Sequence, residues 1–242
     1  MRLHFIRGLG TALLDFVFPP QCLGCEGAME EAGGYLCPGC WGRVVGRTTP
    51  GCRRCSSPYA AEGVQCGNCA SWEPAFERAI VLGDFDEVLQ QAVHALKFRQ
   101  QPGLGVALGR RLGTLPVLSG LLREVDVLVP VPLHGARQRE RGYNQSEYIA
   151  RGLAEVLGKP LCGDLLRRQT NTRQQAKLDA RERKENLVGA FAVVGEVPPH
   201  HCIGLVDDVV TTGATLNACT QALQQAGTRR VWALALASPF HR

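Results

Sequence analysis

The fold is decided by the stretch Val206-Asp207-Asp208-Val209-Val210-Thr211-Thr212-Gly213-Ala214-Thr215, which continues the apolar run 202–206. The run predicts a buried strand with two aspartates at its carboxyl end, and 213–225 has the pattern of a helix. Ligands of open α/β sheets bind outside the carboxyl ends of strands, and helix N-termini favour anions. The stretch therefore predicts a phosphate site in the turn, beside carboxylates that accept hydrogen bonds from sugar hydroxyls. The plainer alternative is a strand that ends in two solvated aspartates before an ordinary helix cap.

Other apolar runs alternate with helical patterns along the chain. Strands are predicted at 79–82, 125–131 and 231–236, and helices at 88–96, 104–112 and 142–157. This alternation favours a doubly wound parallel sheet flanked by helices. We therefore expect an α/β domain over 76–242, preceded over 1–75 by an N-terminal helix and a small cysteine-rich zinc module.

Composition is that of a globular protein. The chain has 242 residues, of which 45% are hydrophobic and 20% charged, with a net charge of +5. This mild surplus permits anionic ligands such as phosphates or nucleic acid. Asp15 interrupts the apolar N-terminus and no small-residue cleavage site follows, so we expect no signal peptide. No stretch reaches the length of a membrane span, and we expect a cytoplasmic protein.

Eight of the eleven cysteines form four Cys-x-x-Cys pairs. The pairs are Cys22/Cys25, Cys37/Cys40, Cys52/Cys55 and Cys66/Cys69, with 11, 11 and 10 residues between them. Four thiolates make a closed tetrahedral zinc site, so eight predict two structural zinc ions. Disulfides, a redox dithiol or an iron–sulfur cluster are the alternatives, and pairs could share a metal sequentially or crossed. Cys162, Cys202 and Cys219 are expected in the core.

Two further segments are rich in arginine. The strand 125–131 leads into a turn that carries Arg137, Arg139 and Arg141, and arginine binds phosphate in a bidentate manner. A solvated basic turn is the alternative. The second segment, 167–186, has seven basic and three acidic residues. A polar connection of this length is typically functional or disordered.

The acid pair and its turn resemble the signature of the type I phosphoribosyltransferases, whose fold is a parallel sheet flanked by helices. The resemblance implies that Asp207 and Asp208 hold the 2′- and 3′-hydroxyls of a ribose. The 5′-phosphate of phosphoribosyl pyrophosphate would lie in the turn formed by Thr211, Thr212, Gly213, Ala214 and Thr215.

One branch fits further. Pro130-Val131-Pro132-Leu133 followed by Arg141-Gly142-Tyr143-Asn144-Gln145 resembles the pyrophosphate loop of the ComF family, which includes competence proteins. Further matches to the ComF family are the motif 96–99 and the spacing of Thr172, Gln175, Leu178, Arg183, Asn186 and 190–191. The resemblance implies Mg²⁺ bound with phosphoribosyl pyrophosphate, an N-terminal zinc-ribbon module and a role in DNA uptake. The resemblance also implies that the substrate is contacted by Lys97, Arg137, Arg139, Arg141, Asn144 and Gln145.

Two hypotheses follow. The first is a phosphoribosyltransferase in which Asp207, Asp208 and Arg141 are catalytic; no general base stands out, although His94 and His134 are candidates. The second is a non-catalytic protein that uses the pocket as a sensor and binds single-stranded DNA or DNA-uptake proteins. Aromatic residues make up only 6% of the chain, so base-stacking platforms are few: Tyr35, Trp41, Tyr59 and Trp72 are the candidates, and a core role is the more common one. A homodimer fits either hypothesis, and the sequence names no acceptor.

Overall fold

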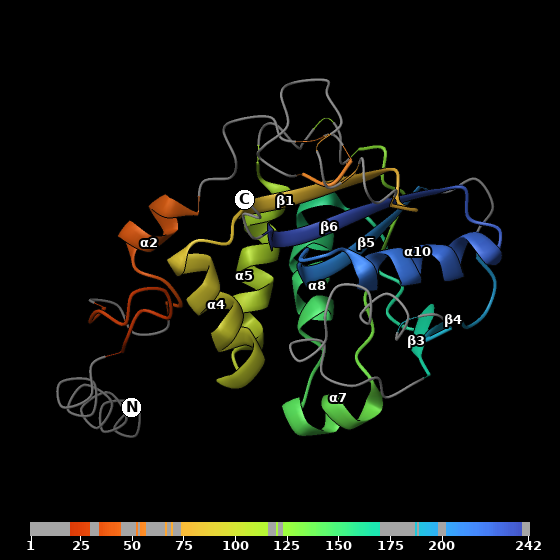
Figure 1. Ribbon diagram of the computed structural model, residues 1–242. Coiled ribbons are helices and arrows are strands. Elements are labelled where there is room, and N and C mark those ends of the chain that lie inside the picture. Colours follow the sequence, from red (N-terminus) through yellow and green to blue (C-terminus); the bar gives the residue numbers. More distant parts are fainter. Residues whose placement is uncertain are drawn as a thin grey trace, which may run out of the picture.

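Figure 1 shows the computed structural model, in which helices cover both faces of a parallel sheet. The structure describes residues 20–29, 34–44, 52, 54–56, 66, 69, 74–115, 120, 123–169, 187, 189–197 and 202–238. The predicted N-terminal helix and most of the basic segment 167–186 lie outside these residues. None of the helices in the described part combines the length and apolar character that crossing a membrane requires.

The described elements alternate as the sequence predicts, which confirms the α/β class. In chain order they are α2 (Pro38–Arg43), β1 (Arg78–Asp84), α4 (Glu87–Phe98), α5 (Pro102–Gly113), β2 (Val127–Pro130), α7 (Gly135–Arg141), α8 (Gln145–Leu157), β3 (Leu166–Arg168), β4 (Phe191–Val193), β5 (Cys202–Val209), α10 (Ala214–Gln225) and β6 (Arg230–Ser238).

The main sheet has the strand order β1-β6-β5-β2, and every described pair in it is parallel. Leu161 adds one parallel bridge to Leu128 of β2. The chain thus leaves β2 through α8 toward Leu161, and leaves β5 through α10 in the opposite direction, toward β6. The strand order reverses between β2 and β5, which is where open α/β sheets open a crevice for a ligand.

The core lies on the two faces of this sheet because successive side chains of a strand point to opposite sides. On β6, Trp232 and Leu234 pack toward α4, α5 and α8, whereas Val231 and Ala233 pack toward α10 and the β3–β4 pair. Both faces are buried, as the nearly continuous apolar runs predict.

Glycines bring α5 and α8 into close contact. A Cβ atom at Gly109 would lie 2.0 Å from the carbonyl oxygen of Ile149, and one at Gly152 would lie 2.0 Å from that of Val106. Neither position has room for a methyl group, so these glycines set the distance between the two helices.

The first cysteine group is part of the same core. Cys22, Leu36 and Cys40 belong to the buried cluster that includes Val88 of α4. Polar contacts join the same parts of the chain: Arg99 pairs with Glu26 at 2.8 Å, and Arg111 Nε donates to the Val44 carbonyl at 2.7 Å. The module therefore braces α4 and α5. The proposed division at residue 75 remains a prediction.

Several local predictions were wrong. The arginine-rich segment 135–141 is the helix α7, not a turn. Gly142 does not begin the next helix: with φ 82° it ends α7, and α8 begins after Asn144, whose side chain caps it. The antiparallel pair β3–β4 was not predicted, because strands of three residues carry too short a pattern.

Candidate functional site

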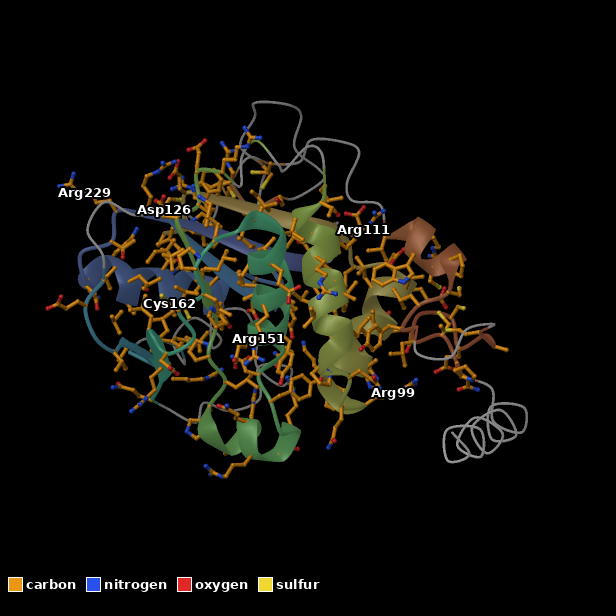
Figure 2. The ribbon with its side chains drawn as sticks, turned by 180° about the vertical axis from the view of Figure 1, so that it is seen from behind. Arg99, Arg111, Asp126, Arg151, Cys162 and Arg229 are labelled. Carbon is orange, nitrogen blue, oxygen red and sulfur yellow. The ribbon has the colours of Figure 1, made fainter. Side chains whose placement is uncertain are left out.

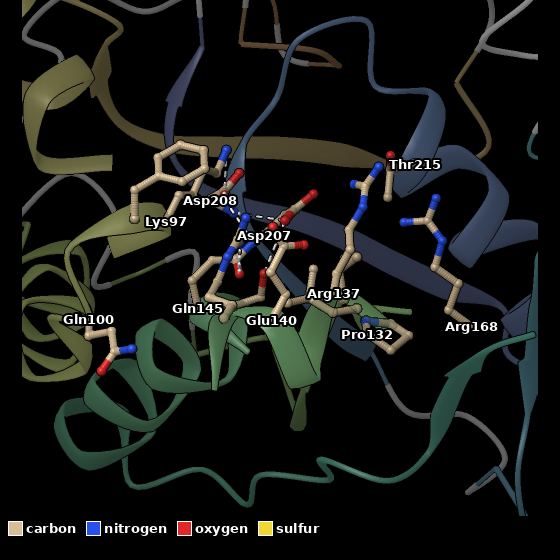
Figure 3. A pocket seen from close by; sticks show the side chains of 15 residues that line it. Lys97, Gln100, Pro132, Arg137, Glu140, Gln145, Arg168, Asp207, Asp208 and Thr215 are labelled. Atoms are coloured by element: carbon tan, nitrogen blue, oxygen red, sulfur yellow. Dashed lines mark hydrogen bonds and ion pairs between the residues drawn. The ribbon is translucent and has the colours of Figure 1, made fainter. Parts of the chain in front are cut away.

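The crevice between β2 and β5 contains a cavity of about 600 Å³. Val131 and Pro132, which follow β2, line it together with Asp207 and Asp208 at the end of β5. Figure 3 shows both carboxylates between a side that carries Lys97 and Gln100 and a side that carries Arg137, Arg168 and Thr215.

The side chains that contact the acid pair come from other elements, and within the pair Asp207 Oδ1 also accepts from the Asp208 N–H at 2.9 Å. Asp208 is buried, and its Oδ2 accepts from Lys97 Nζ at 2.9 Å and from Gln145 Nε2 at 2.9 Å. Asp207 Oδ1 accepts from Ser146 Oγ at 3.0 Å. The last turn of α4 and the first turn of α8 thus fix the two carboxylates in place.

Burial, and secondly the neighbouring Asp208 carboxylate, raise the pKa of Asp207 from its ordinary 3.8 to about 7. The Lys97 ammonium and the Ser146 hydroxyl act in the opposite direction. Asp207 therefore changes its charge near neutral pH, inside a cavity that also holds basic side chains.

The predicted phosphate turn forms a second cavity of about 140 Å³. Thr211, Gly213, Ala214 and Thr215 line it, and it shares Lys97, Asp207, Asp208 and Thr215 with the larger cavity. Gly213 has φ 71° and precedes α10, a conformation that glycine adopts without strain. Thr212 lines neither cavity; its hydroxyl accepts from the Ala214 N–H at 3.4 Å.

The basic residues divide by their place on α7. Arg137 and Arg141 line the larger cavity, whereas Arg139 is exposed and lines neither cavity. Residues four apart share one face of a helix, and the residue midway between them lies away from it. The structure thus separates Arg139 from the predicted phosphate contacts.

The residues that follow α7 have different places. Gln145 lines the larger cavity, where it donates to Asp208 and accepts from Arg141. Asn144 lines neither cavity: its Nδ2 donates to the Val131 carbonyl at 3.0 Å and its Oδ1 accepts from the Ser146 N–H at 3.2 Å. The structure thus gives Asn144 a positioning role, tying the end of β2 to the start of α8.

Arg168 of β3 is a cavity residue that sequence reasoning did not single out. It is 9% exposed, and its guanidinium lies 5.3 Å from the centre of the Phe191 ring on β4. Burial, and then the charge of Arg137, lower the pKa of Arg168. Arg137 and Arg168 therefore lie near each other at the Thr215 side of the cavity (Figure 3). The surplus of basic residues in 167–186 was the available signal.

The two histidines considered as bases line neither described cavity. His94 is exposed and stacks against Phe98, and His134 caps α7, its Nδ1 accepting from the Ala136 N–H at 3.2 Å. The described contacts of both histidines therefore support the local structure of α4 and α7.

The cysteines form two groups of four, and the pairing is sequential. The Sγ atoms of Cys22, Cys25, Cys37 and Cys40 all lie within 4.8 Å of one another, and so do those of Cys52, Cys55, Cys66 and Cys69. Zn–S bonds of about 2.3 Å in a tetrahedron separate sulfurs by about 3.8 Å. The Cys25–Cys37 separation of 3.9 Å and the Cys52–Cys69 separation of 3.8 Å fit that geometry.

In the first group the Cys22 thiolate is favoured, whereas burial, and then the hydrogen bond with Cys22, raise the pKa of Cys40. Burial alone would raise the pKa of Cys22, but hydrogen bonds from the backbone N–H groups of Cys37 and Gly24 outweigh it and lower the pKa to about 6. All eleven cysteines are free thiols, and the two groups fit structural zinc. Cys202 and Cys219 are buried as expected, whereas Cys162 is exposed, contrary to expectation.

Figure 2 shows the molecule from behind, where Arg99 lies on the side of the cysteine module and Cys162 lies on the side away from it.

Comparison with known proteins places the chain in a family. Residues 13–70 match the double zinc ribbon domain. Competence protein F of Haemophilus influenzae is 33% identical over 225 residues, which cover 90% of this chain and 97% of that protein. The chain belongs to the ComF family.

Other ComF-family relatives extend the match. DNA utilization protein YhgH of Salmonella typhimurium is 34% identical over 221 residues, covering 89% of this chain and 96% of that protein. Competence protein ComFC of Bacillus subtilis is 25% identical over 215 residues, covering 85% and 78%. The predicted ComF resemblance and double zinc ribbon are thereby confirmed.

Proposed function

We propose that this ComF-family protein binds phosphoribosyl pyrophosphate with Mg²⁺ in the crevice between β2 and β5, and that it acts in DNA uptake during natural transformation. The observation that carries the binding proposal is the juxtaposition of three parts. They are an acid pair at the end of β5, a cavity-lining turn with Thr211, Gly213 and Thr215 at the start of α10, and basic side chains from α4 and α7.

Each part suits one portion of the ligand. The carboxylates of Asp207 and Asp208 accept hydrogen bonds from the two ribose hydroxyls. Backbone N–H groups and the Thr215 hydroxyl at the start of α10 receive the 5′-phosphate. Lys97, Arg137 and Arg141 neutralise the pyrophosphate. Bound with the substrate, Mg²⁺ would offset more of that charge while keeping several waters.

For a transferase, these residues supply position and charge. As the bond between C1 of ribose and pyrophosphate breaks, positive charge develops on the sugar and negative charge on the leaving group. Arg137 and Arg141 stabilise the leaving group, and the acid pair orients the ribose. An acceptor then bonds to C1.

The role in DNA uptake rests on the three relatives described above, two of which are named competence proteins and one a DNA utilization protein.

The alternative is a non-catalytic protein that senses the sugar phosphate and binds single-stranded DNA through basic residues of 167–186. Removing Arg173, Lys177, Arg181 and Arg183 together, all outside the described residues, should then flatten the salt dependence of DNA binding. An unchanged slope would exclude this segment as the DNA contact.

Calorimetric titration with phosphoribosyl pyrophosphate and Mg²⁺ tests the binding proposal. Wild-type protein should bind saturably, and Asp207→Asn with Asp208→Asn should abolish binding without changing the zinc content. Asp164→Asn is the matched control, because Asp164 is exposed and lines neither described cavity. Unchanged binding by the double variant would rule out the ribose contacts.

Arg137→Ala and Arg139→Ala form a second matched pair on one helix. Loss of a charge-assisted hydrogen bond costs about 1.5–3 kcal/mol, so Arg137→Ala should weaken binding roughly tenfold to a hundredfold. Arg139→Ala should change it little. Equal losses would mean that α7 acts only through its overall charge.

A further inference from the structure

Phe98, the last residue of α4, is 66% exposed although it lines the larger cavity. Val156 and Val194 are the other large apolar side chains exposed in the described part of the chain, and neither lines either described cavity. An exposed phenylalanine in a cavity otherwise rich in charged groups offers an apolar surface to a ligand.

The ring is held in place while most of its surface stays accessible. His94 lies one helical turn earlier, with its ring centre 4.8 Å from that of Phe98 and a tilt of 44°. The Arg141 guanidinium lies 5.8 Å from the ring centre. These two contacts restrict the orientation of the ring, so a ligand that stacks on its accessible surface meets a ring already oriented.

Phe98 also lies at the correct end of the site for a substituent on C1 of ribose. Its neighbour Lys97 contacts Asp208 at 2.9 Å. Lys97 lines both cavities, but Phe98 and Gln100 line only the larger one, and Figure 3 shows Gln100 on the opposite side of the acid pair from Thr215. In a ribose 5-phosphate the phosphate and C1 are on opposite ends of the sugar. A phosphate near Thr215 therefore directs C1 toward the Phe98 side.

Gln100 adds a polar group beside this surface. It lines the same cavity and has φ 49°, a left-handed conformation that few residues other than glycine adopt. Its carboxamide both donates and accepts hydrogen bonds, as the edge of a heteroaromatic ring requires.

We propose that Phe98 is a stacking platform for a planar ring of the nucleobase type, with Gln100 at the edge of that ring. The inference rests on the proposed sugar-phosphate site and specifies the class of group at C1. The ring has two sources with the same chemistry, a free or mononucleotide base and a base of single-stranded DNA.

The test compares two ligands that differ only in the group on C1 of the ribose, which is a hydroxyl in one and adenine in the other. Full-length, zinc-loaded protein is titrated calorimetrically with ribose 5-phosphate and with adenosine 5′-monophosphate. Stacking on an aromatic side chain strengthens binding roughly fivefold to a hundredfold, so the monophosphate should bind more tightly than the sugar phosphate by that factor. Phe98→Ala and Phe98→Leu should reduce this ratio to near one, and Phe98→Trp should keep it. Val156→Ala, an exposed apolar control on α8, should leave it unchanged.

A twelve-nucleotide oligothymidine distinguishes the sources. If it displaces adenosine 5′-monophosphate from wild type and its affinity falls in Phe98→Ala, the ring comes from DNA. If it does not compete, the ring belongs to a small acceptor. Equal affinity of wild type for both small ligands, or a ratio that survives in Phe98→Ala and Phe98→Leu, would overturn the inference while leaving the sugar-phosphate site intact. Absence of ribose 5-phosphate binding would instead contradict the proposed function.

Discussion

Lys97 Nζ lies 2.9 Å from Asp208 Oδ2, and this ion pair joins the last turn of α4 to the end of β5. The side chain of Asp208 is 8% exposed and that of Lys97 is 28% exposed. A charge buried to this degree depends on its partner, because removing one member leaves the other without compensation.

We therefore expect Lys97→Met to destabilise the protein by about 1–3 kcal/mol and to weaken phosphoribosyl pyrophosphate binding by roughly tenfold or more. Urea denaturation and calorimetry measure the two effects. Arg99→Met is the control two residues away, since its ion pair with Glu26 is exposed and should contribute about 0–1 kcal/mol. Similar losses in both variants would contradict a special role for Lys97.

Asp207 should make stability depend on pH. Its pKa in the folded protein, about 7, exceeds its ordinary value of 3.8, so folding favours the protonated carboxyl. The contribution of Asp207 to the free energy of unfolding is therefore present in full below about pH 4 and is lost as pH rises to about 7. Urea denaturation between pH 4 and pH 9 should show this slope in wild type and in Asp164→Asn, and a reduced slope in Asp207→Asn. Parallel curves for wild type and Asp207→Asn would show that Asp207 ionises in the ordinary range.

The contact between α5 and α8 predicts a sharp difference between two helical glycines. Gly109→Ala places a methyl carbon against the Ile149 backbone and should destabilise the protein by about 3 kcal/mol. Gly42→Ala on α2 meets nothing within 4 Å and should be neutral or stabilising by about 0.5–1 kcal/mol. Chemical denaturation measures both, and a tolerated Gly109→Ala would mean that the helices separate easily.

Zinc removal should act differently at the two sites. Metal analysis should find two zinc ions in wild type and one in either Cys40→Ser or Cys66→Ser. Cys40 packs in the cluster that includes α4, so its loss should lower Tm by several degrees and weaken ligand binding at Lys97. Cys66 belongs to a separate small cluster of cysteines, and Cys66→Ser should affect ligand binding less. Equal effects would mean that the first site does not brace α4.

Much of the site could be predicted because its chemistry is local. The strand, turn and helix around the acid pair are contiguous in the chain. The residue types from Asp207 to Thr215 were therefore enough to predict this local structure. The Cys-x-x-Cys pairs are likewise local, since each tight turn places two sulfurs on one side. These features depend on neighbours in the chain and need no knowledge of distant contacts.

The sequence by itself determined the α/β class, the acid pair at the end of a strand with the turn that follows it, and eight cysteines in four Cys-x-x-Cys pairs. Only the tertiary structure decided which cysteines share a site, that Arg137 and Arg141 line the cavity while Arg139 does not, and that Arg168 and Phe98 join it. The reason is physical: helical periodicity selects the face on which a side chain lies, and strand order selects which loops meet. Both depend on packing between segments that are far apart in the chain, such as α4 against the end of β5, and a local pattern carries no record of that packing.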